Sequence, residues 1–538
     1  MRQGQAATGK RRRREQQGER RTTATAPGRL YRDSLALLVD LYELTMAYAW
    51  WRTGRHREEA AFHLLFRRSP FGGGFTVACG LAPAVEYLEG LRFAGEDLDY
   101  LSSLAGNDGR PLFADGFLDY LRGLRFECDL DAVPEGTVVF PQEPLVRVIG
   151  PIAQCQLVES ALLNCINFQT LIATKAARVT LAAQGREVLE FGLRRAQGID
   201  GALSASRAAY VGGCAATSNT LAGKLLGIPV KGTHAHSWVL SFESELEAFL
   251  AYAEALPNNC VFLVDTYDSL AGVRHAVEAG RRLRAGGHEM IGIRLDSGDL
   301  AYLSGEARRI LDQGGFPDAV ILASNDLDEQ VIASLVAQGA PIAVWGVGTR
   351  LVSADGDAAL GGVYKLTALR DPGAGAWRYR LKLSEQVAKI SAPGVQQVRR
   401  YSLDGQPVAD AIYDLQLGIE EAPMLIDPLD MTRRRAIPAG TPWEDLLVPV
   451  LRGGSSVYAP PPLAEVRRRA AEQLGSFHEG IKRFVYPHQY PVGLESRLHD
   501  LRTRMILEAR EAAGTEAPAA GPATAVPLRW PRPGTDPA

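Results

Sequence analysis

The sequence predicts an α/β fold built from parallel βα units. Between residues 187 and 350, short apolar runs that end in polar residues alternate with helix-compatible stretches. Successive runs start about 20 to 30 residues apart, which is the spacing of a strand followed by a crossover helix. We find a repeat of pattern without a repeat of sequence. Both a barrel and a doubly wound sheet are compatible with these observations.

The chain begins with a basic segment. Residues 1–30 contain nine Lys or Arg and two Glu, and they lack the apolar core of a secretory signal. We therefore expect a disordered tail in a cytoplasmic protein. A transit-like presequence, a nucleic-acid-binding arm and an overextended start are the alternatives.

Residues 31–160 are predicted to form a separate layer. Helical pieces at Asp40–Arg52 and Leu81–Leu91 precede a Val-rich, strand-like stretch at Gly136–Ile149. Prolines within and beside that stretch set it apart from the βα units that follow.

The clearest βα units begin near Glu187. The segments that carry the predicted strands are Glu187–Glu190, Ile228–Lys231, Val261–Thr266, Ile291–Leu300, Ala319–Asp326 and Pro341–Arg350. Helices are predicted between them at Ala202–Leu226, Ser244–Ala255, 268–284, 300–313 and 327–338.

Polar residues follow these strands. In parallel α/β folds the loops at the carboxyl ends of the strands form the site. We therefore expect one pocket to collect Arg194, Thr233, His236, Asp265, Arg294, Asp296, Asn325, Gly348 and Thr349.

The C-terminal part is less regular. After Tyr364 the βα pattern ends, and Tyr401–Leu415 has the sequence of an antiparallel hairpin. In Gly514–Ala538, 15 of 25 residues are Pro, Ala or Gly. Such a segment cannot bury enough apolar surface to fold, so we expect 513–538 to be a disordered tail.

The composition is that of a soluble globular enzyme. The chain of 538 residues is too long for one ordinary hydrophobic core. Hydrophobic residues make up 46% of it and charged residues 22%. The net charge of −3 favours neither a nucleic-acid partner nor a membrane surface, and the apolar runs are too short to span a bilayer. Six cysteines form no CxxC pair, so we expect buried thiols rather than zinc clusters or disulfides.

The string GTHAHSW carries two histidines. On an extended strand His234 and His236 would point to one face, and such a pair ligates zinc in some barrel hydrolases. Only His275 and His288 occur in the rest of the βα region, neither at a strand end, which disfavours a zinc site. Two structural histidines are the other alternative. If Thr233 and His236 both serve the pocket, the chain must leave regular strand geometry there.

Three further motifs each have two interpretations. Gly346–Arg350 resembles an anion-binding turn, since no Walker A or GxGxxG motif is present, but it could be a plain turn. RRSPFGGGF (Arg67–Phe75) places two arginines beside a Gly-rich loop that could equally be a surface hairpin. DSGD (Asp296–Asp299) could attract Mg²⁺ or cap the next helix.

Together, these strings resemble the nicotinate phosphoribosyltransferase family. The similarity rests on DLYELTM, FRRSPFGGGF, EFGLRRAQG, GTHAHSW, VDTYDS, GIRLDSGDL, ASNDLDE, GVGTRL, GGVYKL and KLSE, in order over about residues 40 to 400, and on YPVGLESRLHDLR near the C-terminus.

The resemblance implies a type II phosphoribosyltransferase, with an irregular α/β barrel beside an α/β sandwich-like domain. It implies a sandwich-like domain over 31–160 completed by part of 400–512, a barrel with the catalytic site over 161–400, and a C-terminal extension over 401–512 that packs back on the body. It also implies a homodimer with sites near the subunit interface.

The implied reaction joins nicotinate to 5-phosphoribosyl 1-diphosphate, with ATP as co-substrate and Mg²⁺ as cofactor, in NAD salvage. The resemblance makes His236 the phosphorylated histidine, and Tyr42, Thr233 and Arg294 nicotinate contacts. Ser384 stands where the family places a hydroxyl against the sugar diphosphate, although some members have Thr there. Arg194, Asp265, Asn325, Gly348 and Thr349 are further pocket residues. We expect the diphosphate to carry most of the Mg²⁺ coordination, with Asp296 and Asp299 as possible ligands.

Elementary chemistry agrees with these roles. Arg294 can hold a flat carboxylate with its fork of donors, and Tyr42 can supply a π face. The ring nitrogen is the nucleophile and needs no base. Three alternatives remain: the nicotinamide or quinolinate branch of the fold, a nucleic-acid-binding protein that uses Lys10–Arg14, and an inactive structural homologue. GTHAHSW and DLYELTM favour nicotinate.

Overall fold

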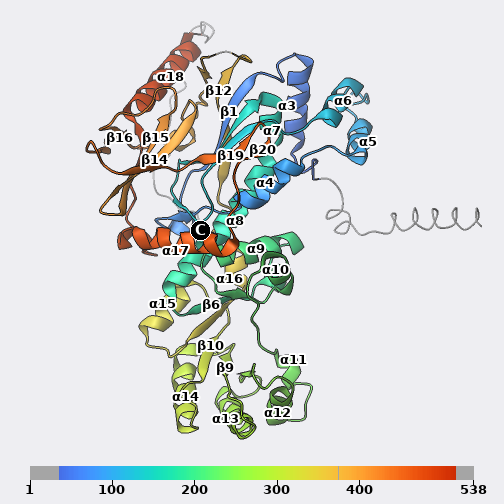
Figure 1. Cartoon of the computed structure of the whole chain (residues 1–538), viewed down its shortest axis with the longest axis vertical. Coiled ribbons are helices and arrows are strands. Elements are labelled where there is room, and N and C mark those ends of the chain that lie inside the picture. The colour runs from blue at the N-terminus through green and yellow to red at the C-terminus, as the bar shows by residue number, and fades with distance from the viewer. Residues whose placement is uncertain (1–34, 374, 516–538) are drawn as a thin grey trace, which may run out of the picture.

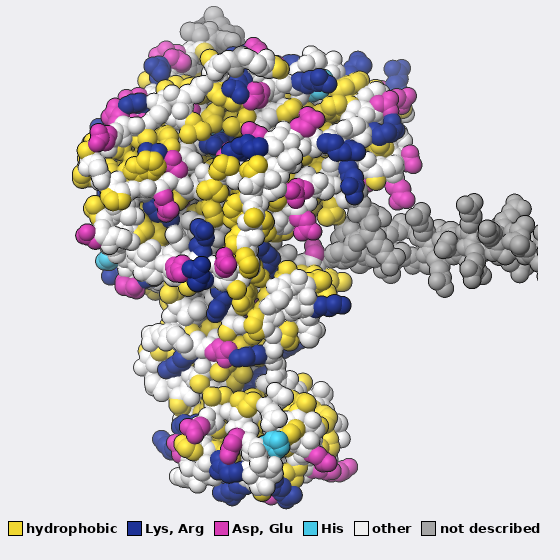
Figure 2. All heavy atoms as spheres, viewed as in Figure 1, with side chains coloured by type: hydrophobic (Ala, Val, Ile, Leu, Met, Phe, Trp, Pro, Cys, Tyr) yellow, Lys and Arg dark blue, Asp and Glu magenta, His cyan; other side chains and the backbone are white. Residues whose placement is uncertain are grey.

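The computed structural model describes residues 35–373 and 375–515, so the two predicted tails lie outside the described residues, apart from the end of the last helix. The chain forms two bodies joined by long helices (Figure 1). In Figure 2 the molecule narrows between the bodies, and acidic and basic side chains are interspersed over the visible face. No described helix has the length and hydropathy of a membrane span.

The upper body contains a seven-stranded sheet in the order β13-β12-β1-β5-β3-β19-β20. Strand β1 (Glu59–Phe66) lies inside this sheet and pairs antiparallel with both β5 (Pro144–Pro151) and β12 (Gly362–Arg370), and its side chains are buried except that of Glu59. The remaining strands of this sheet are β3 (Asp129–Ala132), β13 (Arg378–Tyr379), β19 (Val448–Arg452) and β20 (Ser455–Ser456). A separate two-stranded sheet is formed by β2 (Thr76–Val77) and β4 (Val138–Val139).

Helices of the N-terminal segment accompany this sheet. Helix α7 (Ile152–Leu157) packs on β1 and β5, and α3 (Leu41–Arg52) packs on α7. The other helices of this segment are α4 (Leu81–Gly90), α5 (Gly95–Ser103) and α6 (Asp115–Gly123). Strands and helices that alternate in this way form the sandwich-like layer of the upper body.

The lower body contains a six-stranded parallel sheet in the order β7-β6-β11-β10-β9-β8. The strands are β6 (Glu187–Glu190), β7 (Ala216–Thr217), β8 (Val261–Leu263), β9 (Gly292–Leu295), β10 (Val320–Ala323) and β11 (Val344–Val347). Among the described residues β7 and β8 do not pair, so the barrel is incompletely closed.

Crossover helices follow the strands, as the apolar spacing predicts. They are α9 (Ile199–Val211), α10 (Thr220–Leu226), α11 (His236–Val239), α12 (Glu245–Ala255), α13 (Ser269–Ala285), α14 (Leu300–Gln313), α15 (Glu329–Ala337) and α16 (Thr349–Val352). Asp268, Asp299 and Asp328 begin α13, α14 and α15 with carboxylates that accept backbone N–H groups.

The second sheet of the upper body has the order β17-β16-β21-β15-β14-β18. Strands β14 (Gln396–Leu403) and β15 (Gln406–Asp414) form the predicted hairpin, which turns at Asp404 and Gly405, both with positive φ. The others are β16 (Met424–Ile426), β17 (Arg434–Ala436), β18 (Trp443–Asp445) and β21 (Val492–Glu495), followed by helix α18 (Ser496–Thr515).

Helices α8 (Glu159–Ala182) and α17 (Leu463–Ser476) lie where the two bodies meet (Figure 1). On α8, Lys175 and Arg178 are buried and pair with Glu329 of α15 at 2.8 and 2.9 Å. Buried ion pairs of this kind tolerate little displacement, because separation would leave a charge unpaired. These ion pairs therefore hold α15 of the lower body against α8.

Four details differ from the sequence-based expectation. Predicted helix 202–226 is two helices, because α9 stops before Gly212 and Gly213 and β7 intervenes. Predicted strand 228–231 is a single bridge from Val230 to Thr217, since Pro229 cannot donate to a sheet. His236 begins α11 and does not lie on a strand. Strand β12, within the range expected for the barrel, belongs to the upper sheet instead.

Candidate active site

Arg294 is the centre of the polar cluster at the carboxyl end of β9. Its Nη1 donates to Thr233 Oγ1 at 3.0 Å, its Nη2 to Asp296 Oδ1 at 2.8 Å, and its Nε to Ser324 Oγ at 2.8 Å. The guanidinium also faces the Phe191 ring at 5.8 Å. Side chains from the ends of β6, β9 and β10, together with Thr233, thus fix the orientation of one largely buried cation.

Two carboxylates lie beside this arginine. Asp265 follows β8 and has a buried side chain, and its Oδ2 accepts hydrogen bonds from Asp296 N at 2.9 Å and Ser297 Oγ at 2.6 Å. Its Oδ1 is buried with no hydrogen-bond partner among the described residues. Burial opposes the charge of Asp296, but the positive charge of Arg294 and hydrogen bonds from Ser324 and Arg294 outweigh it and lower the pKa of Asp296.

His236 faces the same carboxylates. Its Nε2 is 3.8 Å from Asp296 Oδ2 and 4.0 Å from Asp265 Oδ1, while its Nδ1 is hydrogen-bonded to Thr266 Oγ1 at 3.1 Å. The side chain is 40% exposed. The chain leaves extended geometry after Ala235, where α11 begins at His236, and Thr233 and His236 both reach the cluster.

His234 has a different role. It is buried, and its Nε2 accepts a hydrogen bond from Leu263 N at 3.2 Å, which links the segment before α11 to the open edge strand β8. Burial lowers its pKa to about 4. His234 thus has the environment of a neutral structural histidine, whereas the exposed His236 is available for chemistry.

The other predicted pocket residues of the barrel also follow strands of this sheet. Arg194 lies in the exposed turn after β6, and Asn325, with a positive φ of 95°, lies after β10. Gly348 lies between β11 and α16, and Thr349 is the first residue of α16. A Cβ on Gly348 would be 3.2 Å from Phe191 O, so this glycine allows the turn to pack against the loop after β6.

Tyr42 and Ser384 do not join this cluster within one chain. Tyr42 lies on α3 in the upper body, whereas β9 and α11 lie in the lower body (Figure 1). Burial, followed by the charge of Glu159, raises the pKa of Tyr42. Ser384 follows β13 of the upper sheet, and its hydroxyl accepts a hydrogen bond from Gln386 N at 3.3 Å.

The two aspartates proposed for Mg²⁺ have other partners. Asp299 caps α14 through Ala301 N and Tyr302 N, and Asp296 Oδ1 is bound by Arg294. Within 35–373 and 375–515, no group of three His, Cys, Asp or Glu side chains is arranged to hold a metal. Asp265 Oδ1, which is buried, and Asp296 Oδ2 have no hydrogen-bond partner among the described residues. This set suits Mg²⁺, which binds one or two carboxylates and otherwise keeps water and substrate phosphates.

Three positioning groups were missed from the sequence. Ser324 connects Arg294 to Asp296, and Thr266 orients His236. Glu190 is buried at the end of β6 and accepts hydrogen bonds from Gly192 N, Ser206 Oγ and Thr217 Oγ1. For Ser324 and Thr266, the available signal in the sequence was a hydroxyl residue near the end of a predicted strand. Glu190 gave no comparable signal, apart from its position next to Phe191.

Comparison with known proteins decides the family. Residues 37–167 match the family model of the nicotinate phosphoribosyltransferase N-terminal domain, and residues 396–502 match that of its C-terminal domain. The Bacillus subtilis protein named nicotinate phosphoribosyltransferase is 41% identical over 498 residues, spanning 89% of this chain and 98% of its own. The chain belongs to the nicotinate phosphoribosyltransferase family.

Solved structures confirm the predicted type II phosphoribosyltransferase fold. The crystal structure of human nicotinic acid phosphoribosyltransferase superposes with a TM-score of 0.76 at 32% identity, covering 87% of this chain and all of that one. Nicotinate-nucleotide pyrophosphorylase from Pyrococcus furiosus, at 22% identity and a TM-score of 0.62, shares the fold. The strings that carry the resemblance to the nicotinate phosphoribosyltransferase family include those that form the Arg294 cluster.

Proposed function

We propose that this chain transfers the phosphoribosyl group of 5-phosphoribosyl 1-diphosphate to nicotinate, coupled to ATP hydrolysis through a phosphohistidine. The products are nicotinate mononucleotide and diphosphate. Family membership supports the reaction, and the observation that carries the choice of acceptor is the arginine held at the end of β9 by Thr233, Asp296 and Ser324.

Arg294 has donors left for a carboxylate. A guanidinium has five N–H groups, and three of those of Arg294 bind protein oxygens. One N–H on each of Nη1 and Nη2 can therefore bind the two oxygens of nicotinate in a fork. Thr233 and Ser324 hold the guanidinium in place, so little side-chain entropy is lost when the acid binds.

The transfer itself needs charge stabilisation rather than a base. The lone pair of the pyridine nitrogen forms a bond to C1 of the ribose, while the bond from C1 to the diphosphate oxygen breaks. Positive charge develops on the ribose, and the carboxylates of Asp265 and Asp296 are placed to stabilise it. The buried Oδ1 of Asp265 is the strongest candidate, because it has no hydrogen-bond partner in the described structure.

Mg²⁺ would be held mainly by the diphosphate, with Asp296 Oδ2 and the buried Asp265 Oδ1 as carboxylate oxygens that no protein group binds in the described chain. When bound, the ion neutralises the leaving diphosphate. Arg194 and the turn at Gly348–Thr349 lie at the same end of the sheet, where a guanidinium, backbone N–H groups and a hydroxyl can meet phosphate oxygens.

His236 is proposed to accept the γ-phosphoryl group of ATP on Nε2. With Nδ1 bonded to Thr266, the exposed Nε2 is the nitrogen that can attack. The N–P bond forms as the bond to ADP breaks, and water later cleaves the phosphohistidine. In the tautomer with Nδ1 protonated, Thr266 Oγ1 accepts that proton's hydrogen bond and Nε2 keeps its lone pair.

A second copy of the chain is proposed to complete the site. Tyr42 and Ser384 lie in the upper body, away from Arg294, so another chain must supply them if they touch the same substrate. Exposed apolar side chains around Tyr42 support this, since Leu38 is 39%, Leu41 54% and Met46 37% exposed.

Subunit mixing tests the shared site. Arg294→Ala and Tyr42→Ala variants should each be inactive alone. After dissociation and reassociation, about half of the dimers are mixed and each has one intact site, so about a quarter of wild-type activity should return. Equal mixing of two Arg294→Ala preparations is the control, and failure of the first mixture to regain activity would place Tyr42 outside a shared site.

The choice of acceptor is tested with nicotinate, nicotinamide and quinolinate, each supplied with the sugar diphosphate, with and without ATP. The proposal expects product from nicotinate, stimulated by ATP. Preference for nicotinamide or quinolinate would assign the chain to another branch of the fold, and no product from any acceptor would favour an inactive homologue.

A further inference from the structure

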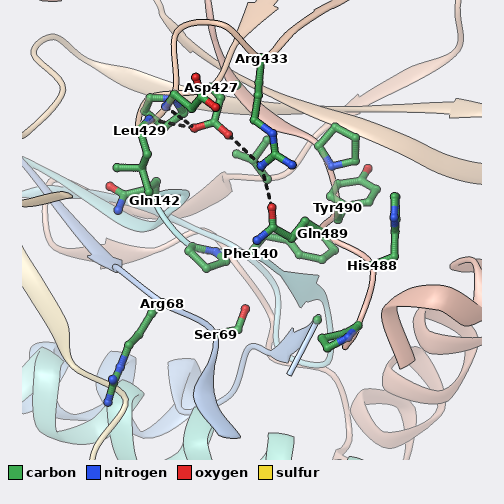
Figure 3. A pocket seen from close by; sticks show the side chains of 18 of the residues that line it. Arg68, Ser69, Phe140, Gln142, Asp427, Leu429, Arg433, His488, Gln489 and Tyr490 are labelled. Carbon is green, nitrogen blue, oxygen red and sulfur yellow. Dashed lines mark hydrogen bonds and ion pairs between the residues drawn. The ribbon is translucent and has the colours of Figure 1, made fainter. Parts of the chain in front are cut away.

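The two bodies differ in how far their open sides are already bonded. A cavity of about 1160 Å³ in the upper body (Figure 3) has Arg433 on its wall, which donates to Gln489 at 2.7 Å and lies 3.8 Å from Asp427. The six-stranded sheet of the lower body ends at β7 and β8, and these edges do not pair with each other in the described chain. Because the residues of the Arg294 cluster follow strands of this sheet, the segment between its edges can affect the site.

Residues 229–234 lie between these two edges. On the β7 side, Val230 forms a bridge with Thr217. Thr217 N donates to Pro229 O at 3.0 Å, and Lys231 N donates to Thr217 O at 3.1 Å. These backbone bonds attach the segment to one edge of the sheet.

The bond on the β8 side comes from a side chain. Val264 N donates to Arg294 O on β9 at 3.2 Å, and successive N–H groups of a strand alternate in direction, so the N–H of Leu263 points to the open edge. His234 Nε2 accepts a hydrogen bond from this N–H at 3.2 Å. Leu263 is buried, and the imidazole therefore satisfies a backbone donor that the carbonyl of a neighbouring strand would otherwise bind.

The second ring nitrogen of His234 fixes the ring on the side of α11. Because Nε2 accepts a hydrogen bond, Nδ1 carries the proton, and it lies 3.4 Å from the carbonyl oxygen of Ala235, the N-cap residue of α11. The ring also lies against Tyr252 and Phe249 of α12, with 4.9 and 6.0 Å between ring centroids. His234 thus has a fixed position relative to β8, α11 and α12.

His234 lies between two residues of the candidate active site. The hydroxyl of Thr233 accepts a hydrogen bond from Arg294 Nη1 at 3.0 Å and donates one to His234 O at 3.2 Å. His236 follows two residues later and begins α11. A shift of His234 away from β8 would therefore move both the hydroxyl that orients Arg294 and the imidazole that is proposed to accept phosphate.

We propose that His234 is a positioning residue for the proposed reaction. Its neutral ring supplies the hydrogen bond that joins residues 229–234 to β8, and this bond holds Thr233 and His236 in the arrangement that nicotinate and ATP require. The inference rests on the proposed function, because it assumes these roles for Thr233 and His236. It adds a buried residue that acts through its neighbours in the chain.

Two variants of the full chain test this role. H234Q places an amide oxygen near the position of Nε2, so it can still accept from Leu263 N, whereas H234N keeps a donor for Ala235 O but is too short to reach Leu263. We expect H234N to raise KM for nicotinate and to slow the labelling of His236 by γ-labelled ATP, each by at least about tenfold, because a displacement of about 1 Å can cost about a hundredfold in rate. H234Q should stay within about threefold of wild type in both, because it keeps the hydrogen bond to β8.

Leu311→Ala separates positioning from a general loss of stability. Leu311 is fully buried on α14, which begins just after β9 and returns to the opposite edge of the sheet, so its truncation lowers the melting midpoint away from the site. With every variant assayed well below its melting midpoint, L311A should keep the wild-type KM and labelling rate. A loss in L311A as large as that in H234N would show that lower stability alone explains the effect, and would overturn the positioning role.

The wild-type measurements distinguish this inference from the proposed function. If wild type is active, an equally active H234N, or an H234Q as strongly impaired as H234N, would overturn the positioning role alone. A wild type that makes no mononucleotide and takes up no label would overturn the proposed function and this inference together.

Discussion

Arg294 and Asp296 lie two residues apart at the end of β9 and form an ion pair of 2.8 Å between Nη2 and Oδ1. The pair fixes the guanidinium before any substrate arrives and lowers the pKa of Asp296. Such preorganisation is useful where a carboxylate ligand must be held in one orientation beside a reacting carbon atom.

Replacing Arg294 by Lys tests the proposed nicotinate fork. A single ammonium replaces two parallel donors, so we expect a loss of about 1.5 to 3 kcal/mol in transition-state binding, or about ten- to a hundredfold in kcat/KM for nicotinate. Steady-state kinetics with each substrate varied in turn would measure it. If KM for the sugar diphosphate changed and that for nicotinate did not, Arg294 would belong to the phosphate side of the site.

Replacing His236 by Ala tests the phosphohistidine. The variant should fold, because the side chain is 40% exposed, but it should lose ATP-stimulated turnover. Incubation with γ-labelled ATP should give an acid-labile, base-stable label on the wild type only. Equal labelling of the variant would remove His236 from this role, and Thr266→Val should reduce labelling by mispositioning the ring.

Replacing Glu190 by Gln tests the positioning of the Arg194 turn. Glu190 accepts three hydrogen bonds at the end of β6, one of them from Gly192 N, two residues before Arg194. Loss of the carboxylate should cost about 1 to 3 kcal/mol of unfolding free energy. Because Arg194 is proposed to meet phosphate oxygens, it should also raise KM for the sugar diphosphate more than it lowers kcat. Ser206→Ala is the control that removes one donor from the same network. Lower stability with unchanged KM would mean a structural role alone.

Acid should destabilise the fold through His234. Burial lowers its folded-state pKa to about 4, against 6.5 when exposed, so the unfolded chain binds more protons between these values. Stability should therefore fall as the pH drops from about 6.5 toward 4, by about 2 kcal/mol from this group at pH 5. Urea unfolding at pH 7 and pH 5 measures the change.

His234→Gln is the matched variant, because its side-chain oxygen can still accept from Leu263 N. It should lose less stability between pH 7 and pH 5 than wild type. His63, whose pKa burial lowers to about 3, acts in the same direction in both proteins and cancels in the comparison. An identical pH dependence of wild type and variant would contradict the neutral buried state of His234.

Local patterns were sufficient to predict much of the fold. The apolar runs of β8 to β11 lie where the sequence placed them, and Asp404-Gly405 produced the expected hairpin. The pairing of β12 with β1 could not be read in the same way, because it joins residues some 300 positions apart that share no local signal.

The sequence was sufficient to predict most residues of the site, but it did not predict how they are arranged in space. Thr233, Asp265, Arg294 and Asp296 meet because parallel strands end at one edge of a sheet. The departure of His236 from strand geometry depends on packing around α11, and Ser324 is significant only because β10 lies beside β9. The separation of Tyr42 from Arg294 is a spatial relationship that strand order alone does not contain.

The stoichiometry of the reaction tests the central claim most directly. Purified chain is supplied with nicotinate, 5-phosphoribosyl 1-diphosphate, ATP and Mg²⁺, and nicotinate mononucleotide, diphosphate and ADP are measured in the same samples. The account predicts equal amounts of mononucleotide and diphosphate, with ADP formed alongside them and far less of it when nicotinate is omitted or His236 is replaced by Ala. Mononucleotide formed at the same rate and yield without ATP consumption, or no mononucleotide at all, would contradict it.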